Sequence, residues 1–190
     1  IEGTQGYGLS LRASGNYPQV TSNDCRSVDF LAMAGIDPTR DGLSIQNWVV
    51  ARVFPIRVAG NSGPLSEEVT WEELGLTPEL TTVTKKVRRV GLWEPKLVAD
   101  AMQANGGRSA KLVITMLDQV VPEFEDFGQY YDSASREWTG PCPINWHPAI
   151  VRTMDWIREN AQELVNSIEA ITYSPTDIVY FRAPLEVYAN

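Results

Sequence analysis

One short segment concentrates the groups of this chain that could bind an anion. It carries four cations and two hydroxyls, at Lys85, Lys86, Arg88, Arg89, Thr82 and Thr84. Guanidinium, ammonium and hydroxyl groups donate hydrogen bonds, and together they can hold a ligand with two negative charges. Runs of like charge are, however, most often solvated faces of a protein. Spacing alone therefore leaves two interpretations, an anion site and a solvated loop.

The rest of the chain has the opposite charge. Its 190 residues include 24 acids against 16 Lys and Arg, a net charge of −8. Residues 63–84 hold five acids and no base, residues 85–111 seven bases and two acids, and residues 112–190 twelve acids and four bases. Such a balance argues against a general nucleic-acid or membrane-surface protein, and no apolar run reaches membrane-span length. We therefore expect no nucleic-acid partner and no membrane partner.

Several common catalytic schemes cannot be assembled from these residues. There is one histidine, His147, and there is neither a phosphate-binding Gly-x-x-x-x-Gly-Lys-Ser/Thr loop nor a nucleophile elbow. His147 precedes Pro148, which predicts a helix cap and not a base. The two cysteines, Cys25 and Cys142, are expected to be free thiols in a cytoplasmic protein. No metal site is predicted within the chain.

Alternating helix and strand patterns predict an α/β fold, a mostly parallel sheet flanked by helices, in a single domain over residues 1–190. Helices are expected near residues 22–31, 95–105 and 148–167, and strands at 7–11, 48–58, 111–117, 170–173 and 178–181. Ligands of such sheets bind in the loops after the strands. We therefore expect binding residues in segments 3–8, 58–63, 117–119 and 174–177.

Five blocks of sequence occur in the order found in adenylosuccinate synthetases. They are Glu2-Gly3-Thr4-Gln5-Gly6, Asn16-Tyr17-Pro18-Gln19-Val20-Thr21-Ser22-Asn23, Pro55-Ile56-Arg57-Val58, Thr81-Thr82-Val83-Thr84-Lys85-Lys86-Val87-Arg88-Arg89-Val90-Gly91 and Thr115-Met116-Leu117-Asp118. Any one block would be a weak signal, but five in order are a strong one. The chain resembles the C-terminal portion of the proteins of this family, and its motifs are most similar to those of the phage-type synthetase of the 2-aminoadenine DNA pathway.

The resemblance implies a purine nucleotide–aspartate ligase, a carbon–nitrogen ligase of purine biosynthesis. Such an enzyme phosphorylates the 6-oxygen of a purine nucleotide from a nucleoside triphosphate with magnesium, and then displaces the phosphate with the amine of aspartate. Family positions around the purine nucleotide are matched by Gln5, Thr21, Val58 and Lys86. Those around aspartate are matched by Thr82, Thr84, Lys86 and Arg88, and those around the donor base by Asp118 and Ser174. With the resemblance, the anion-site interpretation of residues 82–89 outweighs the solvated loop.

Departures from the family pattern leave the substrates open. The family's Thr-Lys-Leu-Asp has Met116 in place of its lysine, and its later Ser-Thr-Gly-Pro-Asp-Arg block has become Thr172-Tyr173-Ser174-Pro175-Thr176-Asp177. These changes put GTP in doubt and leave ATP open. Lys86 stands where an arginine near the sugar is usual, which leaves both IMP and dGMP as acceptors, with dGMP ranked slightly higher.

The family's phosphate loop, its catalytic aspartate and its catalytic histidine are not among these residues. We therefore expect a fragment, an incomplete reading frame or half of a split enzyme, inactive without an N-terminal half or a second chain. The magnesium ligands are expected outside the chain, and a complete protein is expected to be a homodimer. The alternative is a non-catalytic nucleotide-binding module or a relict.

Overall fold

The computed structural model describes residues 1–3 and 6–181 and divides into two compact units. The first comprises Ile1–Asn47 and Phe54–Ala110, and the second comprises Trp48–Val53 and Lys111–Asn190. The expectation of a single domain over residues 1–190 stays a prediction. None of the helices in the described ranges is long and apolar enough to cross a bilayer.

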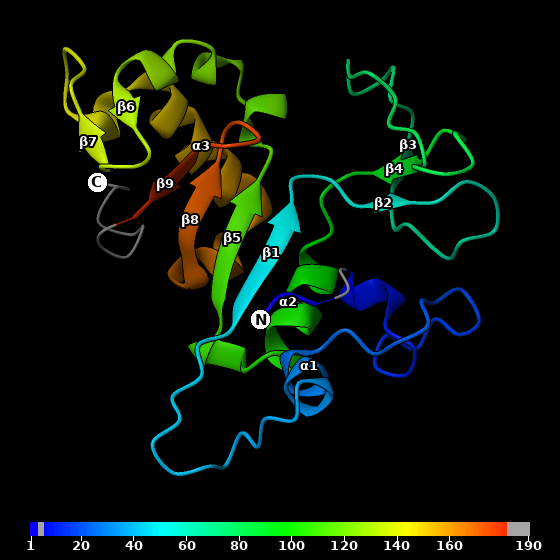
Figure 1. Cartoon of the computed structure of the whole chain (residues 1–190). Helices are drawn as coiled ribbons and strands as arrows, with labels where there is room; N and C mark the ends of the chain where they lie inside the picture. The colour runs from blue at the N-terminus through cyan, green and yellow to red at the C-terminus, as the bar shows by residue number, and fades with distance from the viewer. Residues whose placement is uncertain (4–5, 182–190) are drawn as a thin grey trace. The chain divides into compact units, whose positions relative to one another are not determined.

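The second unit contains the predicted parallel sheet. Strands β1 (Trp48–Arg52), β5 (Lys111–Thr115) and β8 (Ile168–Thr172) run parallel in the order β1-β5-β8, and β9 (Ile178–Tyr180) joins β8 antiparallel. These arrows lie side by side in Figure 1, with α3 (Pro148–Asn160) behind β8 and β9. Leu112 and Ile114 of β5 are fully buried, as the continuous apolar run predicts. The α/β fold with a mostly parallel sheet is confirmed.

The spacing of apolar residues in the sequence 150–168 predicts one apolar face on the last helix, and that face is buried. Ile150, Met154 and Ile157 of α3 face the core, and Ala161 and Leu164 are buried after it. The α-helix nevertheless ends at Asn160, whose side chain donates to the Trp156 carbonyl at 2.9 Å, and a 3₁₀ segment (Gln162–Ser167) continues the chain.

An aromatic cluster fills the space below the start of α3. Its members are Phe124, Phe127, Tyr130, Tyr131, Trp138, Tyr173 and the His147 ring. The His147 Nδ1 accepts a hydrogen bond from the Ala149 amide at 3.2 Å, so the predicted capping role of this histidine is confirmed. The short elements that contribute to the cluster are 3₁₀ turns at Leu117–Gln119, Pro122–Phe124, Phe127–Gln129 and Ile144–Trp146, and a hairpin of β6 (Tyr131–Asp132) with β7 (Glu137–Trp138).

The first unit contains α1 (Ser27–Met33), α2 (Pro95–Ala104) and a small antiparallel sheet. The sheet has the order β2-β4-β3, from Ile56–Arg57, Arg89–Gly91 and Glu68–Val69. The helix predicted near residues 95–105 is confirmed, with Pro95 at its start. The sequence Thr70-Trp71-Glu72-Glu73 predicts a capping box, and it is present, because the Glu73 carboxylate accepts from the Thr70 amide at 2.7 Å.

Three expectations for local structure are wrong. The single strand predicted over residues 48–58 is two strands in different sheets, because the chain bends before Pro55. The first helix starts at Ser27 and not near residue 22, because the Asp29 side chain accepts the Arg26 amide and caps the N-terminus of the helix there. Residues 7–9, expected to end a strand, form a 3₁₀ turn.

Candidate functional site

The basic segment forms a closed loop in the first unit, which we call the basic loop (residues 81–88). An antiparallel bridge between Leu80 and Val87 closes its base. Thr81 organises the inside of the loop, because its amide donates to the Lys86 carbonyl at 2.9 Å and its hydroxyl accepts the Lys86 amide at 3.0 Å. The Thr81 hydroxyl also lies 2.6 Å from that of Thr84. The backbone of the loop is therefore held by its own hydrogen bonds.

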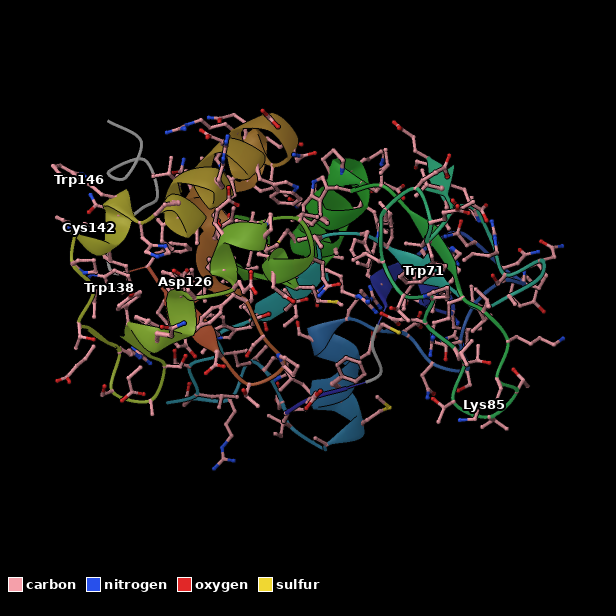
Figure 2. All side chains as sticks on the ribbon, turned by 90° about the horizontal axis from the view of Figure 1, so that it is seen from above. Trp71, Lys85, Asp126, Trp138, Cys142 and Trp146 are labelled. Carbon is pink, nitrogen blue, oxygen red and sulfur yellow. The ribbon has the colours of Figure 1, made fainter. Side chains whose placement is uncertain are left out.

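The side chains with predicted ligand contacts lie on the outside of this loop. Thr82, Thr84 and Lys86 are exposed, and Arg88 is half-buried. Figure 2 shows Lys85 at the outer end of the loop. Lys85, Lys86 and Arg88 form no ion pair with another described residue. Three cations thus stand close together without a neutralising carboxylate, which is the electrostatic condition for binding an anion.

The fourth cation of the segment is already paired. Arg89 donates from Nε to one Glu68 oxygen at 2.7 Å and from Nη2 to the other, and its Nη1 donates to the Gly63 carbonyl at 2.9 Å. This pairing lowers the pKa of the Glu68 carboxyl and raises that of the Arg89 guanidinium. Arg89 is therefore neutralised within its own sheet, and the anion site predicted over residues 82–89 stays a prediction.

A buried tryptophan fixes the end of the basic loop. The indole Nε1 of Trp71 donates to the Arg88 carbonyl at 2.7 Å, and the ring packs edge-on against Phe54 with centroids 6.0 Å apart. Trp71 is labelled in Figure 2. This contact of Trp71 was not predicted from the sequence. The only sequence signal near it is the capping-box pattern of Thr70 and Glu73, which marks the turn that carries Trp71.

The residues predicted to bind the purine nucleotide also belong to the first unit. Thr21 is half-buried, and its amide donates to the Leu9 carbonyl at 2.7 Å. Val58 is exposed, and its carbonyl accepts the Ser62 hydroxyl. Gln5 lies outside the described residues. The nucleotide role of Thr21, Val58, Lys86 and Gln5 stays a prediction.

The two residues predicted at the donor base line one hollow in the second unit. It has a volume of about 360 Å³ and lies where β5 and β8 end. Its walls are formed by Asp118, Pro122, Phe124, Glu125, Gly128, Tyr173, Ser174 and Asp177. Phe124 and Tyr173 are stacked, with centroids 5.2 Å apart and planes 12° from parallel. The structure thus brings Asp118 and Ser174 together beside an aromatic surface.

The polar groups of this hollow are hydrogen-bonded to one another. The Ser174 hydroxyl donates to Asp177 at 2.6 Å and accepts the amides of Thr176 and Asp177 at 3.1 and 2.9 Å. The hydrogen bond from Ser174 is the main cause that lowers the pKa of Asp177, helped by those from Thr176 and Ser133. Gln119 donates to one Asp118 oxygen at 2.6 Å, and the other Asp118 oxygen has no hydrogen-bond partner among the described residues. A carboxylate can accept the N–H groups of a purine base.

Backbone geometry supports the same hollow. Met116 follows β5 with φ +68°, and its amide donates to the Thr172 hydroxyl at 3.2 Å. This bond joins the ends of β5 and β8, the two strands whose following loops carry Asp118 and Ser174. Phe124 and Tyr173 were missed from the sequence. Asp177 lies in the segment 174–177 that was expected to carry binding residues, and the Ser-Pro-Thr-Asp pattern is typical of a serine-centred turn.

Metal binding has no visible basis in the described residues, where no group of three or more His, Cys, Asp or Glu side chains is close enough to hold an ion. That the ligands of the magnesium implied by the resemblance lie outside this chain stays a prediction, and we derive no step through the ion. Both cysteines are free thiols, as predicted.

Comparisons with known proteins connect this geometry to a family. The family described as Adenylosuccinate synthetase matches residues 1–127. The N6-succino-2-amino-2'-deoxyadenylate synthase of Vibrio phage phiVC8 is 54% identical over 94 residues, which cover 47% of this chain and 26% of the phage protein. The adenylosuccinate synthetase of Methanocaldococcus jannaschii is 36% identical over 182 residues, which cover 94% of this chain and 43% of that enzyme.

A solved structure gives the same result. The succinoaminodeoxyadenylate synthetase of cyanophage S-2L, bound to dGMP and to dATP as an energy donor, matches with a TM-score of 0.62 and 26% identity. The match covers 98% of this chain and 48% of the phage enzyme. The chain spans less than half the length of the relatives it matches. The chain belongs to the adenylosuccinate synthetase family.

Proposed function

We propose that this chain forms part of a ligase that joins aspartate to C6 of a purine nucleotide at the expense of a nucleoside triphosphate. The single observation that carries the proposal is the basic loop, whose Lys86 and Arg88 have no carboxylate partner among the described residues. The two carboxylates of aspartate would supply the missing negative charges. The hydroxyls of Thr82 and Thr84 would add donors in fixed positions.

The chemistry has two steps. The γ-phosphoryl group passes from the triphosphate to O6 of the purine, and the diphosphate leaves. The amine of aspartate then attacks C6, so that the new C–N bond forms and the C6–O bond breaks with loss of phosphate and a proton. The residues of this chain bind and orient the reactants in both steps, and the acid and base groups of the family are not among them.

The acceptor that we propose is dGMP. The supporting observation is the higher identity to the phage synthase, 54% against 36% to the archaeal enzyme, although over a shorter stretch of the chain. The product would then be N6-succino-2-amino-2'-deoxyadenylate. IMP is the second candidate, because the archaeal likeness extends over 182 residues.

The donor that we propose is ATP or its deoxy form, held with its base in the hollow between Asp118 and Ser174. Asp118 offers a carboxylate oxygen to a base N–H, and the stacked pair of Phe124 and Tyr173 provides an aromatic wall. The cyanophage relative takes dATP as its energy donor, and Met116 replaces the lysine that the family pattern has. GTP is the alternative donor.

A further partner is proposed at the open edge of the sheet. Within the described residues β1 pairs with β5 on one side only, and its Trp48 and Val50 are 44% and 65% exposed. Parallel strands are almost always covered, and an apolar open edge is a template for pairing. We propose that another part of the family's polypeptide, in the same chain or in a second chain, pairs with this edge and supplies the catalytic groups. Cytoplasmic location and a homodimeric complete enzyme remain part of the proposal.

The experiment is a product assay on this chain alone and mixed with the N-terminal part of the Vibrio phage synthase. We expect dGMP, aspartate and ATP with magnesium to give the succino product only in the mixture. Aspartate and dGMP binding to the chain alone, measured by calorimetry, tests the site independently of turnover. Turnover by the chain alone at a complete enzyme's rate would contradict the need for a partner.

Binding of dGMP with no effect of aspartate, and no product in the mixture, would favour the non-catalytic nucleotide-binding module. Affinity for DNA that falls steeply as salt rises would instead show that the basic loop binds phosphates of nucleic acid.

A further inference from the structure

The strongest feature of the first unit that the proposed function does not use is a buried arginine. Arg57 is 7% exposed, and its guanidinium is hydrogen-bonded to backbone carbonyls and to no described carboxylate. Glu94 attracts it electrostatically without a hydrogen bond. Nε donates to the Pro64 carbonyl at 2.6 Å, Nη1 to the Ser62 carbonyl at 2.8 Å, and Nη2 lies 3.4 Å from the Gly8 carbonyl. A buried charge is costly, so its retention on three carbonyls calls for an explanation.

The local electrostatics make this position more costly still. Arg57 pairs with Arg89 across the β2–β4 ladder, so two cations stand opposite one another. Burial, and then repulsion by Arg89, lower the pKa of the Arg57 guanidinium. Glu68 offsets the charge of Arg89, but no described carboxylate is hydrogen-bonded to Arg57. The desolvation of the Arg57 guanidinium is therefore not offset by a hydrogen-bonded ion pair.

The hydrogen bonds of Arg57 join two segments that are distant in sequence. One is the loop at residues 58–64, which begins at Val58 and whose carbonyls at Ser62 and Pro64 accept from Arg57. The other is the turn that includes Gly8, followed by Leu9, whose carbonyl accepts the Thr21 amide at 2.7 Å. Val58 and Thr21 are the two described residues, besides Lys86, that we propose to contact the purine nucleotide.

Gly63 marks how closely the guanidinium approaches the loop at residues 58–64, whereas Gly8 is in ordinary contact with it. A Cβ on Gly63 would lie 2.7 Å from Arg57 Nη1, and one on Gly8 would lie 3.6 Å from Nη2. Gly63 also has φ +100°. Because a side chain at Gly63 would collide with the guanidinium, the loop is shaped around Arg57.

We infer that Arg57 is a positioning residue that sets the spacing of the two nucleotide-binding segments by holding their carbonyls on one planar cation. The inference rests on the proposed function, because it concerns the same purine nucleotide site. In this inference Arg57 does not contact the ligand, because its guanidinium donates to backbone carbonyls. A lysine could keep the charge but could not hold carbonyls from three directions.

The test compares Arg57→Lys with wild type by calorimetry with dGMP and, separately, with ATP. We expect dGMP to bind at least 10-fold more weakly to Arg57→Lys, with ATP affinity and the circular dichroism spectrum unchanged within twofold. Arg108→Lys, at an exposed arginine, is the matched control and is expected to bind dGMP as wild type does. Equal dGMP affinity in Arg57→Lys and wild type would overturn the inference.

A second variant approaches the same contact from the other side. Gly63→Ala should weaken dGMP binding as Arg57→Lys does, because its Cβ displaces the guanidinium. Its control is Gly42→Ala, where φ is also positive (+76°) but nothing lies within 4 Å of the new Cβ. Weaker dGMP binding in both alanine variants would point to backbone strain alone and would count against the inference.

Hydrogen exchange separates failure of the inference from failure of the proposed function. If wild type binds no dGMP, the proposed site is wrong, but the positioning role of Arg57 can still be tested. In that case Arg57→Lys should lose protection at the Thr21 and Ser62 amides while the amide of Leu92 in the neighbouring strand region keeps it. Unchanged protection at Thr21 and Ser62 would overturn the inference whether or not the nucleotide binds.

Discussion

The basic loop and the hollow lined by Asp118 and Ser174, which we call the donor-base hollow, differ in how their polar side chains are hydrogen-bonded. In the basic loop the backbone is held by Thr81, while Lys86 and Arg88 keep their charges free. In the hollow, Ser174 and Asp177 satisfy each other, and Asp118 is partly engaged by Gln119. If the proposed roles hold, the first arrangement separates the residues that support the loop from those that bind, whereas the second uses the same side chains for both. Mutations should therefore act on affinity alone in one region and on affinity and stability together in the other.

The largest effect is expected for Arg88→Met. Charge-assisted hydrogen bonds contribute about 1.5–3 kcal/mol, so aspartate affinity should fall about 10- to 100-fold, measured by calorimetry. The free energy of unfolding should stay within about 0.5 kcal/mol, because the Arg88 side chain supports no described ion pair. Lys96→Met, which breaks an exposed pair with Asp100, is the control with unchanged aspartate binding. Equal aspartate affinity in wild type and Arg88→Met would remove the basic loop from the site.

A matched pair of threonine variants separates support from binding within the basic loop. Thr81→Val removes the hydroxyl that accepts the Lys86 amide and should cost about 1–3 kcal/mol, measured by urea unfolding. Thr82→Val, at an exposed residue, should leave stability within about 0.5 kcal/mol and weaken aspartate binding. If both variants lose the same stability, the division of labour between support and binding is wrong.

Ser174→Ala should show the combined effect expected of the hollow. It removes the main hydrogen bond that lowers the pKa of Asp177, so stability should fall by about 1 kcal/mol after allowance for solvent screening, and ATP should bind more weakly. Because the pKa of Asp177 is lower in the folded chain than in the unfolded chain, where it is about 3.9, the ionised carboxylate stabilises the fold fully at pH values above about 3.9. This stabilisation is lost as the pH falls through the pKa of the folded state. The stability difference between wild type and Ser174→Ala should therefore be larger at pH 7 than at pH 3.

Ser135→Ala is the control for that variant, because Ser135 donates to the Asp132 carboxylate at 2.7 Å in the same unit but outside the hollow. It should lose stability with a similar pH dependence and bind ATP as wild type does. A loss of ATP affinity in both serine variants would mean that acid-sensitive stability, and not the hollow, controls binding.

Several parts of the fold that the sequence predicted are held by local contacts, and the buried strand β5 was predicted from its continuous apolar run. The start of α2 at Pro95, the buried stripe of α3 and the capping box at Thr70 each depend on residues within one or two turns. The β2-β4-β3 sheet has strands of two and three residues, and its pairs join Ile56 to Val90 and Glu68 to Gly91. Such short strands have no periodicity to detect, so only the folded chain reveals them.

The candidate site follows the same division. Asp118 and Ser174 were placed by family resemblance, and the structure brings them to one hollow. The stacked Phe124 and Tyr173 were not found, because their contact depends on packing across the ends of two strands. Asp177 was expected only as a member of the segment 174–177, and its hydrogen bond with Ser174 was not. The neutralisation of Arg89 by Glu68 was missed because the partners lie 21 residues apart.

The smallest effect is expected at Lys85, where a comparison with its neighbour Lys86 separates backbone strain from ligand binding. Its backbone has φ +53°, a region that costs a non-glycine residue about 1 kcal/mol, and its side chain makes no described ion pair. Glycine removes that cost but adds unfolded-state entropy of about 0.5–1 kcal/mol, so Lys85→Gly should change unfolding free energy by less than about 1 kcal/mol. Lys86→Gly, at a residue without positive φ, should lose stability and aspartate affinity together. If Lys85→Gly lowers aspartate affinity as far as Arg88→Met does, Lys85 binds the ligand directly, and the loop tip as well as its end belongs to the site.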